Sequence, residues 1–192
     1  MASASPPRYR LAGSLAMVNA LLTIPWVIMT FFLQDRDLLV MKILNALLMT
    51  ASTGIFVYTS LTLRKLLNTG HSFTDADRYL LLMIKAGVVL TFISLLETAL
   101  PAFASAAGTL ALFLIVPLGI VQILFGLKLQ NLPSELGGLR RPYCYLNIFT
   151  GFCFASILLM PVGIITGAIT DIMLGTIFFQ ESKTGRLINT EA

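Results

Sequence analysis

The chain has 192 residues, of which 57% are apolar and only 11% are charged, and its mean hydropathy is +0.88. A soluble globular domain carries roughly 25% charged residues, so this composition excludes an ordinary water-soluble fold and predicts a protein that has the lipid bilayer as its solvent. The formal net charge of +4 is too small and too scattered for a nucleic-acid-binding surface.

The first two membrane spans are predicted from apolar runs long enough to cross the bilayer, which takes about 20 residues. Residues 11–33 form an uncharged run that contains Pro25 as an expected kink. Residues 43–63 form the second run, which ends at Arg64 and Lys65. Residues 1–10 are expected to be a cytoplasmic N-terminal tail.

The third and fourth spans follow a polar stretch that ends at Arg78. Residues 79–100 form the third run, and two ionisable residues, Lys85 and Glu97, interrupt it. Residues 109–127 form the fourth run and contain Pro117.

The last apolar stretch, residues 142–180, is open to two interpretations. One kinked helix of 39 residues would be about 58 Å long at 1.5 Å per residue, nearly twice the hydrocarbon core. Two helices that turn near residues 160–163 would each have about 17 residues, the low end of the spanning range. Length favours the pair and a bundle of six helices in three hairpins, with five helices as the alternative.

Positive charges favour the same interpretation, because Lys and Arg concentrate on the cytoplasmic side of membrane proteins. Six spans with a cytoplasmic N-terminus place ten basic residues inside and two, Arg36 and Lys42, outside. Five spans change this ratio to eight against four. The ten are Arg8, Arg10, Arg64, Lys65, Arg78, Lys128, Arg140, Arg141, Lys183 and Arg186.

The resulting prediction is an all-α, polytopic transmembrane helical bundle. Residues 11–180 form its single transmembrane domain, and residues 181–192 form a cytoplasmic C-terminal tail. The compact hairpin layout favours a bacterial inner membrane, with both termini in the cytoplasm.

Ionisable side chains within a span are costly, so each requires a reason. Asp171 lies in the middle of the last predicted helix, and Lys85 lies at a similar depth in the third. An ion pair between them is therefore predicted. It would be either a relay or substrate contact, or a structural pair that fixes the helix register. The alternative to a pair is that Lys85 reaches the lipid headgroups while Asp171 accepts hydrogen bonds from hydroxyl and amide groups. Glu97, near the end of its helix, is interpreted as an interfacial carboxylate.

Small residues surround Asp171 at helical spacing. Gly163, Gly167 and Gly175 lie at four-residue intervals with Asp171 and predict a face on which helix backbones approach closely. This face would turn Asp171 toward the interior of the bundle.

No residue pattern predicts a cofactor, a metal site or an enzyme. Cys144 and Cys153 are nine residues apart without a CxxC motif, and His71 is the only histidine, so a zinc or haem site is not expected. Two functions remain open. The first is a small structural or accessory subunit that packs against a membrane-protein partner or a second copy of itself. The small number of polar residues within the spans favours this function. The alternative is a small transporter or channel whose pathway passes Asp171 and Lys85.

Overall fold

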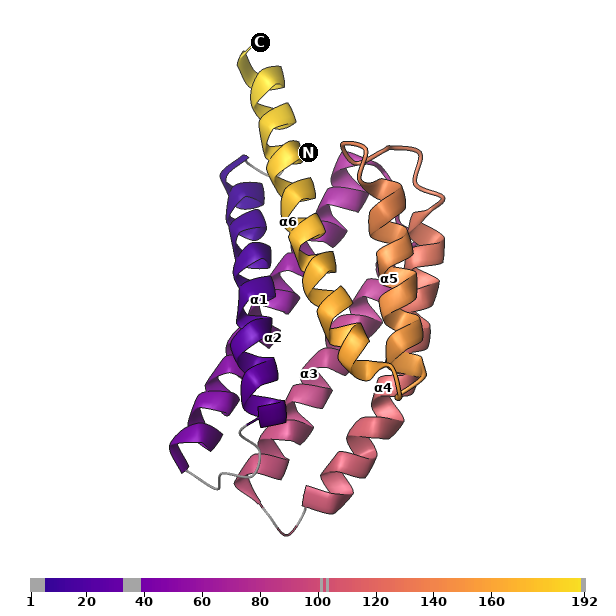
Figure 1. Ribbon diagram of the computed structural model, residues 1–192. Coiled ribbons are helices and arrows are strands. Elements are labelled where there is room, and N and C mark those ends of the chain that lie inside the picture. Colours follow the sequence, from indigo (N-terminus) through magenta and orange to yellow (C-terminus); the bar gives the residue numbers. More distant parts are fainter. Residues whose placement is uncertain (1–5, 33–38, 101, 103, 191–192) are drawn as a thin grey trace.

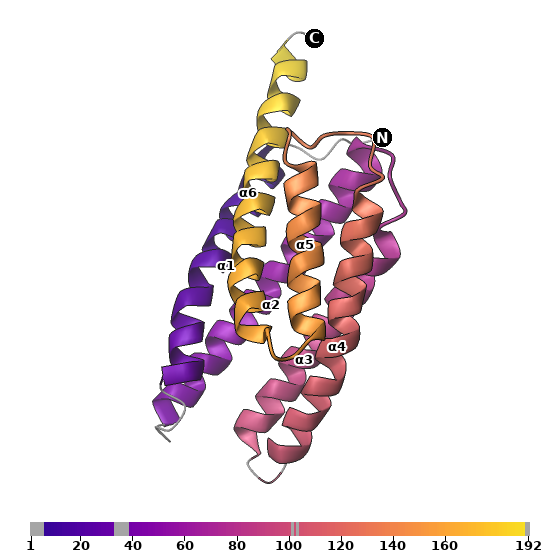
Figure 2. The same ribbon diagram turned by 45° about the vertical axis from the view of Figure 1, so that its right-hand side comes forward.

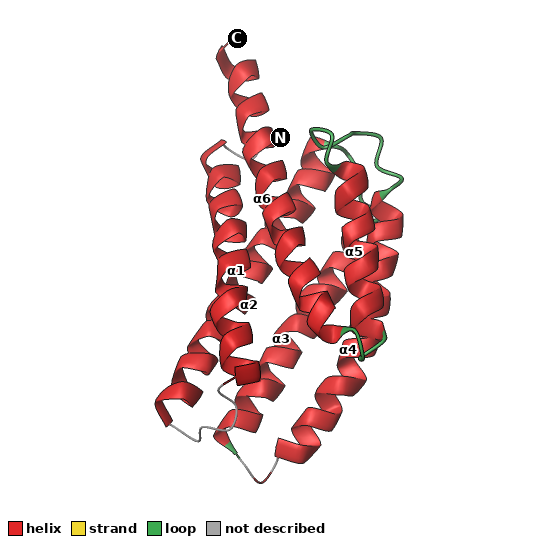
Figure 3. Cartoon of the chain, in the orientation of Figure 1, coloured by secondary structure: helices red, strands yellow, loops and turns green. Residues whose placement is uncertain are grey.

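The computed structural model describes residues 6–32, 39–100, 102 and 104–190, and this part of the chain is helical without strands (Figures 1 and 3). This confirms the predicted helical bundle. A π-helical turn, η1 (Leu66–Gly70), extends the second helix. The six α-helices are α1 (Pro6–Phe32), α2 (Leu39–Lys65), α3 (Asp77–Ala99), α4 (Ala104–Leu129), α5 (Arg140–Ala155) and α6 (Met160–Thr190).

Five of the helices are long and apolar enough to cross a membrane: α1, α2, α3, α4 and α6. Pro25 and Pro117 lie inside α1 and α4, as predicted. The 16 residues of α5 extend only about 24 Å at 1.5 Å per residue, which is less than the hydrocarbon thickness of about 30 Å.

The last apolar stretch is divided into two helices, as its length predicts, but the position of the turn differs. The chain turns at residues 156–159, and residues 160–163 form the first turn of α6. The predicted turn at Pro161 was wrong because proline also fits the first turn of a helix, where its missing N–H removes no hydrogen bond.

The six helices form a closed ring. Each helix packs against the next one along the chain, and α1 closes the ring against α6. We call the end of the ring where α1 begins and α6 ends the terminal end, and the opposite end the distal end. At the terminal end α6 continues beyond the other helices (Figures 1 and 2).

Glycine allows two of these helix pairs to approach most closely. A Cβ atom on Gly119 of α4 would lie 2.6 Å from the carbonyl oxygen of Gly151 in α5. A Cβ atom on Gly175 of α6 would lie 2.9 Å from the carbonyl oxygen of Gly13 in α1. These backbone contacts join different predicted hairpins and hold the ring together.

The terminal end is filled by a hydrophobic core, to which all six helices and their connections contribute. Its fully buried side chains include Leu67, Leu129, Leu132, Ile177 and Phe178.

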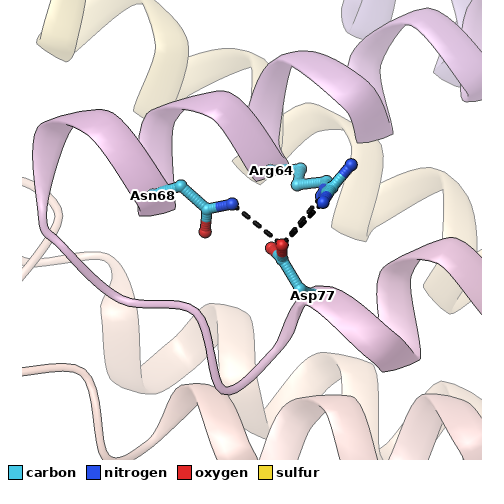
Figure 4. Close-up of polar contacts among 3 residues, drawn as sticks. All are labelled: Arg64, Asn68 and Asp77. Atoms are coloured by element: carbon cyan, nitrogen blue, oxygen red, sulfur yellow. Dashed lines mark hydrogen bonds and ion pairs between the residues drawn. The ribbon is translucent and has the colours of Figure 1, made fainter.

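A polar contact fixes the connection between α2 and α3 beside this core (Figure 4). Asp77 accepts hydrogen bonds from Arg64 at 2.8 and 2.9 Å and from Asn68 at 2.9 Å. The carboxylate lies in the first turn of α3, where an acidic group is also favourable to the helix dipole.

Candidate functional site

A central cavity of about 450 Å³ lies inside the ring, and all six helices contribute to its lining. Toward the terminal end its lining residues are buried, among them Leu63, Phe125 and Tyr143. Toward the distal end the lining residues are partly exposed, among them Trp26 and Met160. The cavity is therefore closed at one end by the hydrophobic core and accessible from the other.

Asp171 of α6 lies in the wall of this cavity and is held by a chain of hydrogen bonds across three helices. Asn19 of α1 donates its side-chain N–H to Asp171 Oδ2 at 2.6 Å. Ser52 of α2 donates its hydroxyl to Asn19 Oδ1 at 2.6 Å. Each donor thus orients the next acceptor, and the carboxylate is placed by groups far apart in the sequence.

Lys85 and Asp171 are not brought together. Lys85 is exposed on α3, which makes no contact with α6 across the ring. Among the described residues no ion pair joins the two side chains, and the partner of Asp171 is Asn19. The predicted pair was inferred from depth alone, and two residues at equal depth can still lie on opposite sides of a ring.

The other predicted site residues occupy separate places. Glu97 is exposed near the end of α3. Gly163 packs against the ring of Phe154, whereas Gly175 packs against α1, so the glycines face different neighbours. Gly167 lines the cavity.

The cysteines and the histidine lie outside the polar part of the cavity. Cys144 and Cys153 are free and buried in α5. His71 Nε2 lies 3.7 Å from Glu181 Oε1, so the loop that carries His71 approaches α6.

Three of the hydroxyl groups in the cavity wall present acceptors to its interior. Thr23, Thr59 and Thr170 each donate to a backbone carbonyl of their own helix. Because each hydroxyl has a single proton, what remains available on these groups is lone pairs. One side-chain N–H of Asn147 is likewise donated to the carbonyl oxygen of Tyr143. The carboxylate of Asp171 and these acceptors make this part of the wall electronegative, and the side chains of Ser60, Gln122 and Tyr143 add polar groups that can also donate.

The rest of the lining is mainly apolar. Helix α3 contributes Leu80, Met83 and Leu90, and α4 contributes Leu118 and Phe125 together with one polar side chain, the buried Gln122. The described lining contains no Lys, Arg or His, so its only full charge is the carboxylate of Asp171.

Aromatic rings complete the lining. Phe56, Phe125, Tyr143 and Phe154 lie in the wall, and Trp26, the only tryptophan of the chain, lies toward the distal end. Aromatic faces attract cations, by up to about 2 kcal/mol when the contact is desolvated.

Comparison with known proteins gives no assignment: no family model matches the chain, and neither a curated protein nor a solved structure is similar to it. The functional argument therefore rests on the cavity.

Proposed function

We propose that this protein is a small membrane carrier that binds an organic cation with an apolar body in the central cavity. The supporting observation is the unbalanced lining, in which Asp171 and the acceptor lone pairs of hydroxyl groups face a space without any described basic side chain. A carboxylate in a low-dielectric environment requires a compensating charge or a proton, and a bound cation supplies that charge.

The same lining disfavours other solutes. An anion would need Arg or Lys side chains to neutralise its charge, and the described lining contains neither, whereas the carboxylate of Asp171 would repel it. A strongly hydrated ion such as Na⁺ would gain little from the apolar side chains that α3 and α4 contribute. An amphiphilic cation uses both walls, its charged group at Asp171 and its body against Leu118 and Phe125.

This proposal takes up the sequence-based alternative of a transporter in preference to an accessory subunit. In the sequence the polar residues within the spans are few and scattered, and this favoured the accessory subunit. Their convergence on one cavity from α1, α2, α4, α5 and α6 supports the transporter, with Asp171 in its pathway and Lys85 outside it.

Binding is tested with benzyltrimethylammonium and its uncharged carbon isostere, neopentylbenzene. The purified protein is titrated in nanodiscs, and the fluorescence of Trp26 in the cavity wall reports occupancy. We expect the cation to bind at least tenfold more tightly than the isostere. Asp171→Asn is expected to remove this preference, because it removes the charge but keeps the shape of the side chain.

The control variant is Glu97→Gln, which removes an exposed carboxylate outside the cavity and should leave both affinities unchanged. Uptake of the cation into proteoliposomes then tests transport. Equal affinity for the cation and its isostere in the native protein contradicts the proposal.

For the location we propose a bacterial inner membrane with both termini in the cytoplasm. The support is the excess of basic residues at the terminal end, where Arg64, Lys65, Arg78 and Lys128 lie close to helix ends. A C-terminal green fluorescent protein fusion should fluoresce in bacterial cells, and an alkaline phosphatase fusion at the same site should be inactive. The opposite pattern would reverse the orientation.

A further inference from the structure

The hairpin of α5 and α6 ends well before the distal ends of α3 and α4 (Figures 1 and 2). The contact between Gly119 and the α5 residues Gly151 and Ala155 fixes the level at which α5 ends. From Gly119, α4 continues for fifteen residues to Ala104, which is about 22 Å at 1.5 Å per residue.

This distal part of α4 has the character of a lipid-facing helix. It carries no ionisable residue, and Leu110, Leu112 and Phe113 are exposed on it, Phe113 by 74%. Side chains of this kind belong in hydrocarbon. The turn between α5 and α6, at the level of Gly119, is therefore also at membrane depth.

The turn itself has the composition that such a position requires. Apart from Ser156, residues 156–160 are apolar, and Leu158 is 88% exposed. An exposed apolar turn is unfavourable in water, whereas lipid acyl chains solvate it.

The backbone N–H groups of the turn are also satisfied within the protein, as hydrocarbon demands of a non-helical segment. Each amide N–H of residues 156–160 donates a hydrogen bond of 2.5–3.3 Å to a nearby acceptor. The acceptors are the carbonyl oxygens of Phe152, Phe154, Ser156 and Ile157 and the hydroxyl of Ser156. Pro161, next in the chain, has no N–H to satisfy.

The cavity reaches this turn. Its lining includes Phe154 and Met160, on the two sides of the turn, and Trp26 of α1 and Ile115 of α4. Helices α1 and α4 do not contact one another, so beyond the turn the ring is incomplete between them in the described part of the chain.

We propose that the α5–α6 hairpin enters the membrane and returns without crossing it, and that the cavity opens beside its turn into the hydrocarbon. The ligand is then a membrane-dissolved amphiphilic cation that enters from the lipid phase. The ligand class rests on the proposed function, whereas the depth of the turn does not. A hairpin that returns to the side it entered leaves both termini on the same side of the membrane, as six complete crossings would. The distribution of basic residues is therefore compatible with both arrangements.

The depth of the α5–α6 turn in the membrane is tested with a variant whose single tryptophan lies at the turn, Leu158→Trp in a Trp26→Phe background. The protein is reconstituted in phosphatidylcholines that carry bromine at a shallow, an intermediate or a deep position of the acyl chain. We expect the strongest quenching of this tryptophan by an intermediate or deep bromine. A matched Leu100→Trp variant, at the end of α3, should be quenched most by the shallow bromine.

Strongest quenching of both variants by the shallow bromine, or quenching of Leu158→Trp by aqueous acrylamide, overturns the proposal. If the Trp26→Phe background does not fold, Leu158→Cys and Leu100→Cys are compared instead, each with Cys144→Ala and Cys153→Ala to remove the native thiols. A membrane-impermeant maleimide should label Leu100→Cys and leave Leu158→Cys unlabelled, because the reagent attacks a thiolate and neither is stable in hydrocarbon. Labelling of both overturns the proposal.

The route of entry is tested with hexadecyltrimethylammonium, a cation confined to the membrane, and the fluorescence of native Trp26. We expect occupancy to depend on the mole fraction of the cation in lipid, so that adding protein-free lipid to the same nanodisc mixture releases it. Binding of benzyltrimethylammonium without binding of the long-chain cation overturns lateral entry but not the proposed function. Absence of binding by both cations removes the proposed function and leaves the depth result to stand alone.

Discussion

Replacing Gly119 with leucine is expected to separate α4 from α5 and to prevent assembly of the ring. The Cβ atom would lie 2.6 Å from two backbone atoms, the carbonyl oxygen of Gly151 and the amide nitrogen of Ala155. Backbone atoms within a helix cannot move without displacing the whole helix, so relief requires α4 and α5 to move apart. We expect a loss of at least about 3 kcal/mol of stability, the upper end of the usual cost of overpacking.

Helix α4 supplies its own control. Gly108 lies in the same helix, and a Cβ atom there would meet nothing within 4 Å. Gly108→Leu should therefore change stability by no more than about 0.5 kcal/mol. The two variants are compared by size-exclusion chromatography in detergent and by titration of SDS into mixed micelles. Equal behaviour of the two would show that the α4–α5 contact does not hold the bundle together.

The positions of the helices could be predicted from the sequence because the lengths of the apolar runs and the positions of the charged residues indicate where each helix begins and ends. Apolar runs show where a helix can cross lipid, and basic residues such as Arg64 and Lys128 mark where a run ends. The turn before α6 was misplaced by about four residues because Pro161 is compatible with either a turn or the first turn of a helix.

The site could be predicted only in part. Asp171 stood out because a charge within an apolar run is costly. Its partner could not be found in this way, since Asn19 is 152 positions away in the sequence and resembles the other amides within the spans. Depth along a helix can be read from the sequence, whereas the order of helices around a ring depends on close packing between residues such as Gly119 and Gly151.

Substitutions of Asn19 and Asp171 should have non-additive effects on the free energy of unfolding. A double-mutant cycle tests this prediction. Asn19→Leu keeps a similar volume but leaves the carboxylate without its donor, and a lost hydrogen bond to a charged group costs about 1.5–3 kcal/mol. In the variant that also carries Asp171→Leu, no unpaired charge remains. We therefore expect the double variant to be more stable than the sum of the single effects predicts, by about 1–3 kcal/mol.

The matched control is Asn45→Leu in α2. The amide nitrogen of Asn45 donates to the sulfur of Met49, at 3.9 Å, and its buried carbonyl oxygen has no hydrogen-bond partner among the described atoms. Replacing it removes an unsatisfied polar group, so stability should be unchanged or increased, as measured by SDS titration. Additive effects of the two site substitutions would mean that Asn19 packs beside Asp171 without stabilising its charge. The affinity for an organic cation would then depend on the carboxylate alone, because no amide would hold Asp171 in place before the ligand binds.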